Sequence, residues 1–72
     1  MRGAIGKRAA EEIRRNAYEN DVHLGFELDC IKSSHSSLFQ WEHGNADPNA
    51  ATLAKMLKMG YDISYILLGV RT

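Results

Sequence analysis

Residues 31–44 of this chain read Ile-Lys-Ser-Ser-His-Ser-Ser-Leu-Phe-Gln-Trp-Glu-His-Gly, and this stretch decides the fold. A short polar turn ends one apolar segment, and the hydroxyl of Ser33 or Ser34 can cap the helix that follows. We predict this helix over residues 34–43, with Gly44 as its end. The segment therefore predicts a turn followed by a helix of about two and a half turns.

The predicted helix has two faces of different composition. Leu38 and Trp41 lie three residues apart and therefore share the buried face. The other face carries hydrogen-bonding side chains around one aromatic ring, namely His35, Ser36, Phe39, Gln40 and His43. Exposed helix faces are usually filled with Lys and Glu. A helix that shows solvent uncharged hydrogen-bonding groups is suited to contact base edges in the major groove of DNA.

The remaining sequence predicts four further short helices, divided by glycines and a single proline. We expect these helices over residues 5–18, 22–31, 49–59 and 63–68. No segment alternates between polar and apolar residues for long enough to predict a strand. The sequence therefore predicts an all-α fold and a single domain that spans residues 1–72.

Each predicted helix carries apolar residues that can face a common core. The predicted inward residues are Ala9, Ile13 and Ala17 in the first helix and Leu53, Met56 and Leu57 in the fourth. Lys55 and Lys58 then face outward, and Cys30 is expected to be a small core residue. Asn20-Asp21 is the expected end of the first helix, and Asp62 can cap the fifth.

Composition excludes several classes of protein. Apolar residues make up 44% of the chain, which is ample for a core. A single cysteine permits no internal disulfide and is typical of a reducing cytoplasm. No segment approaches the length of a membrane span, and the first residues lack the apolar stretch of a signal peptide. We therefore expect a cytoplasmic protein that does not bind membranes.

The net charge of zero is unusual for a DNA-binding domain, because many such domains are basic. The charges are unevenly distributed, however. Residues 1–15 hold five basic and two acidic side chains, whereas the rest of the chain holds four basic and seven acidic ones. The non-specific affinity for DNA should then be weak. Dimerisation or well-chosen base contacts would have to supply the rest of the binding free energy.

In the order and spacing of its motifs, nearly the whole chain resembles the helix-turn-helix domains of phage repressors and related bacterial regulators, the Cro/CI-type or XRE group. The segment Ser34-x-Ser36-Ser37-Leu38-Phe39-Gln40-Trp41-Glu42-His43-Gly44 looks like that family's recognition helix with its Trp-Glu-x-Gly ending. Asp47-Pro48 matches the following turn, and residues 53–69 look like the fourth and fifth helices. The final ten residues are especially similar to phage CI-type repressors.

The chain departs from the family in and after the second predicted helix. Leu24 stands where the family usually has a Gln that contacts a phosphate, and Leu28 stands where a small Ala is usual. Ser33 stands where an apolar residue usually follows the turn.

The resemblance implies a five-helix, phage-repressor-like helix-turn-helix domain that binds double-stranded operator DNA as a transcriptional regulator of the phage or prophage repressor type. Base contacts carried over by position are His35, Ser36 and Gln40. The amide of Gln40 can donate and accept at once, which matches adenine N6 and N7. Phe39 could touch a thymine methyl group, or it could fill a gap in the core.

Phosphate contacts are expected from hydroxyls, from basic residues and from one imidazole, namely Ser34, Ser37, Arg2, Lys7, Arg8 and His43. Lys55 and Lys58 are further candidates. The resemblance also implies that Glu42 forms a structural ion pair with Arg14 or Arg15 of the first helix.

The fifth predicted helix is more apolar than one short helix can bury on one side, and such surfaces usually mark interfaces. We therefore expect a homodimer whose interface includes Tyr65, Ile66, Leu68 and Val70. A two-fold dimer would place two recognition helices about 34 Å apart. Ordinary packing under the first and fourth helices is the alternative.

Several features of the sequence favour or exclude functions other than DNA binding. A protein-interaction module on the same scaffold, such as an antitoxin-like partner binder, is favoured by the zero net charge and by Leu24. His23, Cys30, His35 and His43 match no recognised ligand spacing, so no metal is expected. No nucleophile, base and acid occur in a catalytic pattern, so we expect no enzyme activity, cofactor or small-molecule ligand. Both a complete Cro-like protein and the N-terminal domain of a longer repressor fit the sequence.

Overall fold

The computed structural model describes residues 3–71, and over this range it holds five α-helices and no strand. The helices are α1 (Ala4–Glu19), α2 (Leu24–Cys30), α3 (His35–Glu42), α4 (Ala50–Lys58) and α5 (Ile63–Leu68). The prediction of an all-α fold is confirmed, and the predicted bounds lie within two residues of those observed. The largest difference is at the start of α2, where Val22 precedes the helix and is exposed.

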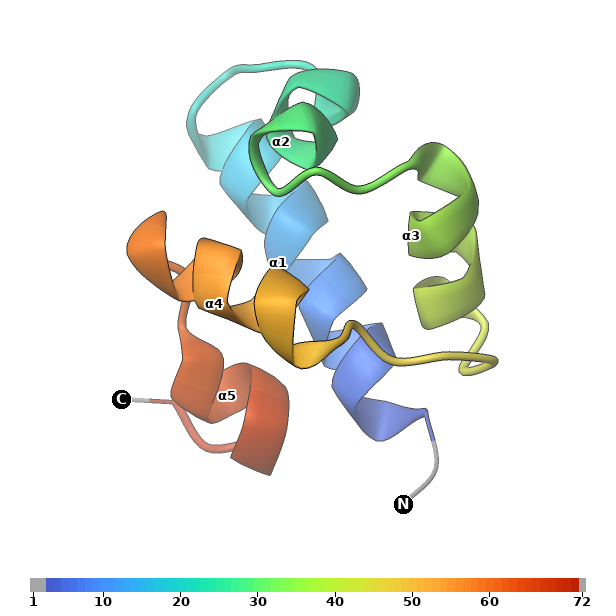
Figure 1. Cartoon of the computed structure of the whole chain (residues 1–72). Coiled ribbons are helices and arrows are strands. Elements are labelled where there is room, and N and C mark those ends of the chain that lie inside the picture. Colours follow the sequence, from blue (N-terminus) through green and yellow to red (C-terminus); the bar gives the residue numbers. More distant parts are fainter. Residues whose placement is uncertain (1–2, 72) are drawn as a thin grey trace.

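The longest helix, α1, is the central element of the fold. It contacts α2, α3 and α5, and α4 in turn contacts α5 (Figure 1). In Figure 1, α2 lies at the far end of α1, α3 lies on one side, and α4 crosses in front. This arrangement leaves one side of α3 without a neighbouring helix.

The core is one cluster to which all five helices contribute buried side chains. Ala9 and Ile13 of α1 are fully buried, and Ala17 is almost so, which confirms the predicted stripe. Small alanines on α1 allow its neighbours to approach closely. The other helices and turns supply larger buried side chains, namely Leu28, Ile31, Leu38, Trp41, Met56, Tyr61 and Ile66.

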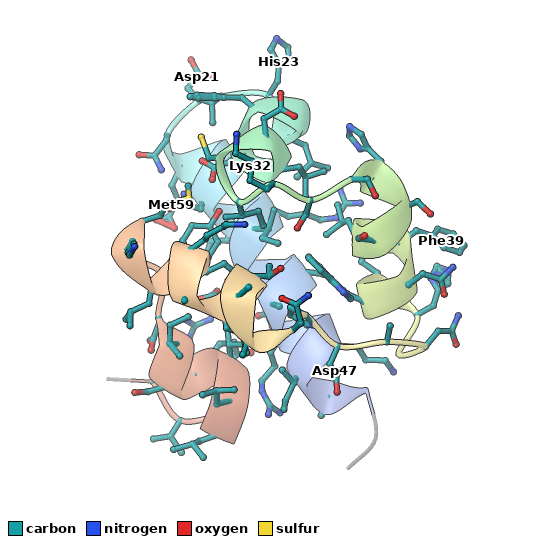
Figure 2. All side chains as sticks on the ribbon, in the orientation of Figure 1. Asp21, His23, Lys32, Phe39, Asp47 and Met59 are labelled. Atoms are coloured by element: carbon teal, nitrogen blue, oxygen red, sulfur yellow. The ribbon has the colours of Figure 1, made fainter. Side chains whose placement is uncertain are left out.

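The α3–α4 loop supplies the cap that α1 lacks. The N-cap residue of α1 is Gly3, which has no side chain to accept a hydrogen bond. A carboxylate oxygen of Asp47 accepts instead from the backbone N–H of Gly6 at 2.8 Å, beside the start of α1 (Figure 2). A carboxylate at this end of a helix satisfies an otherwise unpaired N–H and interacts favourably with the helix dipole. The contact joins residues 41 apart in sequence and fastens the loop after α3 to α1.

Helices α1 to α4 end in one recurring backbone pattern, the Schellman motif, in which a residue in the left-handed conformation follows the C-cap. After α3 this residue is Gly44, and the N–H of Asn45 reaches back to the carbonyl of Gln40 at 2.9 Å. After α1 and α2 the left-handed residues are Asp21 and Lys32, with φ of 54° and 56°. The predicted end of α1 is confirmed.

Glycine at position 32 should stabilise the chain. A side chain with a Cβ is strained at positive φ, whereas glycine is not, although glycine also adds entropy to the unfolded chain. We expect Lys32→Gly to raise the free energy of unfolding by about 0.5–1 kcal/mol, measured by thermal unfolding. The matched control is Lys55→Gly, also exposed but inside α4, which should lower it by about 1 kcal/mol. Equal losses for both variants would contradict the prediction.

Two residues predicted to be in the core lie at the surface, and these predictions were wrong. Leu57 is 62% exposed, because α4 packs on the core through Met56 and Leu53, and Leu57 lies about 100° around the helix from Met56. Cys30 is exposed because Leu28, two residues earlier in α2, is buried, and such residues point about 200° apart. Lys55 and Lys58 face solvent, as predicted.

Candidate nucleic-acid interface

Helix α3 packs on the protein through its inner face, and both of its ends are capped. Leu38 and Trp41 are 2% and 5% exposed, which confirms the predicted buried face. At the start of the helix, the Ser34 hydroxyl accepts from the N–H of Ser37 at 3.1 Å, so Ser34 is the N-cap. At the end, the Gly44 turn closes the backbone. The orientation of the outer face is therefore fixed.

The outer face of α3 is exposed along its whole length. Its exposed residues are the five predicted from the spacing, His35, Ser36, Phe39, Gln40 and His43. Phe39 is 52% exposed and projects away from the body of the protein (Figure 2), so the alternative that it fills a gap in the core was wrong. None of these five side chains is Lys, Arg, Asp or Glu.

Two of these side chains form an aromatic pair. The rings of Phe39 and His43 are stacked, with centroids 4.0 Å apart and planes 25° from parallel. The residues lie four apart and therefore on one side of the helix. The spacing could have revealed this contact in the sequence.

The ion pair predicted for Glu42 forms with Arg14. Two guanidinium nitrogens of Arg14 donate to the two carboxylate oxygens of Glu42. The hydrogen bonds hold the pKa of Glu42 below its usual value and raise the pKa of Arg14. Arg15, the other candidate, instead pairs with Glu19 and Glu12. The pair links α3 to α1, and the carboxylate of Glu42 is bound to Arg14. Because both side chains are partly exposed, its net contribution to stability is at most about 1 kcal/mol.

A polar groove lies beside the start of α3. Its volume is about 580 Å³, and it is lined by Lys32, Ser33, Ser34, Ser37, Trp41, Asp47, Pro48, Asn49 and Thr52. The N-termini of two helices meet there, because Asn49 caps α4 by accepting from the N–H of Thr52 as Ser34 caps α3. Helix N-termini, hydroxyls and a lysine are groups that contact phosphate oxygens in nucleic-acid complexes.

The other predicted phosphate contacts are scattered. Lys7 lies beside Gly44, since a Cβ built there would come within 3.0 Å of the lysine Cε. Arg8 is engaged within the protein, because its guanidinium donates to the carbonyls of Ile66 and Leu67 at 2.9 and 3.1 Å. The structure thus corrects the prediction for Arg8, whose side chain binds the end of α5. Arg2 lies outside the described residues.

The predicted dimer surface on α5 is only partly exposed. Ile66 is fully buried, so the prediction that it contacts a second subunit was wrong. Leu68 and Val70 are 74% and 61% exposed. Tyr65 is half-buried, with its hydroxyl donating to Glu11 and the guanidinium of Arg71 over its ring. The hydrogen bond to Glu11 raises the pKa of Tyr65.

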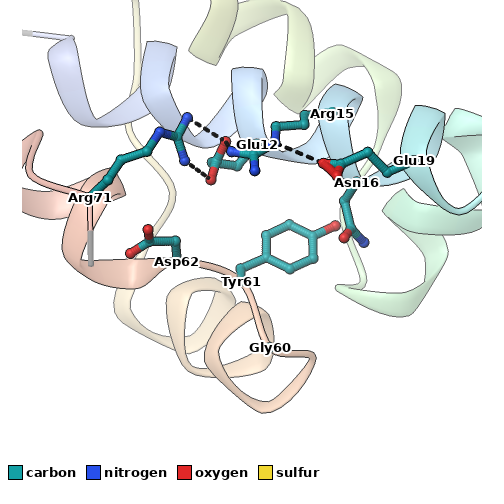
Figure 3. Close-up of a pocket in the computed structure, with 8 residues that line it drawn as sticks. All are labelled: Glu12, Arg15, Asn16, Glu19, Gly60, Tyr61, Asp62 and Arg71. Atoms are coloured by element: carbon teal, nitrogen blue, oxygen red, sulfur yellow. Dashed lines mark hydrogen bonds and ion pairs between the residues drawn. The ribbon is translucent and has the colours of Figure 1, made fainter.

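A second hollow, of about 150 Å³, lies between α1 and the α4–α5 turn (Figure 3). Its main feature is Glu12, a carboxylate that is only 7% exposed. Both oxygens accept from Arg71, at 3.0 and 3.2 Å, and Arg15 donates at 3.4 Å. Sequence reasoning missed this cluster, since Arg71 and Glu12 lie 59 residues apart. Because its charges already pair within the protein, the outer face of α3 is the stronger candidate for a binding surface.

Two further features, a metal site and a membrane-spanning helix, are both absent from the described part of the chain. Within residues 3–71, no three His, Cys, Asp or Glu side chains gather in a way that could hold a metal ion. No helix in that range has the length and apolar composition needed to cross a membrane. Comparison of the chain with protein-family models, with curated proteins and with solved structures gave no match.

Proposed function

We propose that this chain is a sequence-specific DNA-binding transcriptional regulator of the phage or prophage repressor type, with a five-helix helix-turn-helix fold. The observation that carries the proposal is the outer face of α3, which is exposed and holds no Lys, Arg, Asp or Glu. The imidazole, hydroxyl and amide groups of this face match the donors and acceptors of base edges.

The shape of α3 is compatible with this use. An α-helix with its side chains is about 10–12 Å in diameter, and the major groove of B-DNA, about 12 Å wide, admits it. The polar groove beside its first turn can receive a backbone phosphate while the helix lies among the bases. Contacts to phosphate would come from Ser34, Ser37 and Lys32, with Lys7 near the other end of the helix.

Gln40 is the side chain expected to carry most base discrimination. It is exposed on the outer face, and within residues 3–71 its amide makes no hydrogen bond, whereas its backbone is fixed by Asn45. A bidentate pair with adenine N6 and N7 contributes about 1–3 kcal/mol of discrimination. His35 and Ser36 lie nearer the start of α3 and would contact neighbouring bases or phosphates.

A homodimer would raise the affinity for DNA, which the zero net charge of a single chain leaves weak. Leu68 and Val70, together with Leu67 and Leu57, expose apolar surface on or near α4 and α5. If this surface joins two copies about a two-fold axis, the operator is a near-palindrome with half-sites about 34 Å apart. Two weak half-site contacts then act together.

The test is a selection of bound sequences from random duplexes at two ionic strengths. We expect enrichment of a near-palindrome, and affinity that falls with salt at a slope of about −0.9 per phosphate contacted. Gln40→Ala should lose preference at one base position by about 1–3 kcal/mol while non-specific affinity is retained. The control Tyr18→Ala, at a position 87% exposed near the end of α1, should bind as the unaltered chain does. No enrichment would overturn the proposal, whereas an unchanged preference in Gln40→Ala would overturn the role of Gln40.

The second candidate is a protein-interaction module on the same scaffold, such as an antitoxin-like partner binder. The exposed apolar side chains Leu57, Leu67, Leu68 and Val70 favour it, as does the zero net charge. The two candidates differ in what the chain binds. Absence of any DNA binding at low salt, together with a stoichiometric protein partner, would support the second candidate.

A further inference from the structure

The most unusual residue on the outer face of α3 is Phe39, because an aromatic ring does not share the hydrogen-bonding character of its neighbours. The core does not need this ring, since Leu38 and Trp41 already fill the inner face of the helix. Over half of the Phe39 side chain remains in contact with solvent. This inference rests on the base-reading role proposed above. If α3 lies in the major groove, the exposed ring of Phe39 needs an apolar group on the DNA to contact.

The ring of Phe39 is held in place before any ligand binds. His43 stacks on it at 4.0 Å, and His43 is itself the C-cap of α3. After His43, the backbone N–H groups of Gly44 and Asn45 donate to the carbonyls of Trp41 and Gln40, at 3.1 and 2.9 Å. These bonds fix the backbone on either side of His43. A side chain that is already ordered loses little conformational entropy on binding. The stacking thus favours one orientation of the Phe39 ring, on the same outer face as Gln40.

The major groove offers one prominent apolar group on its floor. Base edges there present donors and acceptors, and the exception is the methyl group at C5 of thymine. The same methyl group occurs on 5-methylcytosine, whereas uracil and unmodified cytosine lack it. Apolar contact from a Phe side chain to this methyl group is a known mode of base readout.

We infer that the Phe39–His43 pair reads the methyl group at pyrimidine C5, so that the preferred half-site holds a thymine next to the base contacted by Gln40. Phe39 supplies the apolar contact, and the ring of His43 stacks on it. Burial of one methyl group corresponds to about a fourfold gain in affinity. Because the contact recognises the methyl group alone, 5-methylcytosine satisfies it as thymine does.

The experiment uses the duplex recovered by selection with the unaltered chain. Each thymine is replaced in turn by deoxyuridine, which differs only by the missing methyl group. At one position in each half-site we expect the substitution to weaken binding about fourfold. Cytosine at that position should also weaken binding relative to its 5-methylated form. In Phe39→Ala, thymine and deoxyuridine should bind equally well, whereas Gln40→Ala should keep the preference for thymine.

Several outcomes separate this inference from the proposed function. If a duplex is selected but deoxyuridine is tolerated at every position, methyl reading is overturned and DNA recognition stands. If Phe39→Ala keeps the preference for thymine, another residue reads the methyl group and the inference again falls. If no duplex is enriched, the proposed function and the inference fail together. Because Phe39 is half exposed, its variant should unfold at an unchanged temperature; the deoxyuridine scan of the unaltered chain decides even if it does not.

Discussion

Replacement of Gly6 by alanine should lower the free energy of unfolding by about 3 kcal/mol. A Cβ at this position would lie 2.3 Å from the carbonyl oxygen of Ala46 and 3.2 Å from the Cα of Trp41. Both neighbours are backbone atoms, so no side chain can rotate away to make room. The α3–α4 loop would have to move, and the hydrogen bond from Gly6 to Asp47 would be lost with it.

The matched control for this variant is Gly25→Ala, in which the same methyl group is added to another helical glycine. At Gly25 the nearest atom to the added Cβ is Nε2 of His35, at an ordinary 3.6 Å. Alanine is the better helix former, so this variant should gain about 0.5–1 kcal/mol. Urea unfolding of both variants measures the difference. If both variants lost a similar amount of stability, or if neither variant lost any, α1 would not contact the α3–α4 loop as described.

The helices could be predicted because their signals are local. Ser34 and Asp62 each lie at the position from which a side chain caps the helix that follows, and both do so. The buried pair Leu38 and Trp41 follows from their spacing of three residues. For the same reason the outer face of α3 was predicted correctly, because periodicity alone determines which residues oppose a buried pair.

The contacts that could not be predicted depend on where helices meet. Nothing near Gly6 in the sequence indicates that a loop more than 40 residues away supplies the cap of α1. Ile66 was assigned to a dimer surface, but helix α5 turns this residue into the core and leaves Leu68 exposed. The periodicity of so short a helix cannot determine which of its several apolar residues face inward. Arg8 was likewise assigned to phosphate, although the end of α5 lies within its reach.

A buried carboxylate joins α1, α2 and the α4–α5 turn. Glu27 is 5% exposed, and its two oxygens accept from the side-chain amide of Asn16 at 3.0 Å and from the hydroxyl of Tyr61 at 2.5 Å. Burial, with the hydrogen bond to Glu27 as a second cause, raises the pKa of Tyr61 far above its usual value. Tyr61 is therefore neutral in the folded protein at any pH at which the unfolded tyrosine is neutral, and it acts as the donor.

Tyr61→Phe should lower the free energy of unfolding at neutral pH by about 2 kcal/mol, because one oxygen of a buried carboxylate loses its donor. Tyr18→Phe, at the 87% exposed tyrosine, should change it by less than about 0.5 kcal/mol.

The raised pKa of Tyr61, caused first by burial and then by the hydrogen bond to Glu27, gives the pH dependence a definite sign. An unfolded tyrosine loses its proton near about pH 10, whereas folded Tyr61 keeps it to a higher pH, so the unfolded state binds fewer protons above pH 10 and stability falls as pH rises. Tyr61→Phe removes this contribution, while all other titratable side chains are the same in both proteins. The stability difference between the unaltered chain and Tyr61→Phe should therefore be constant from about pH 7 to about pH 10 and shrink above it. A difference that stays constant through alkaline pH, measured by urea unfolding, would show that burial and the hydrogen bond to Glu27 do not keep Tyr61 protonated.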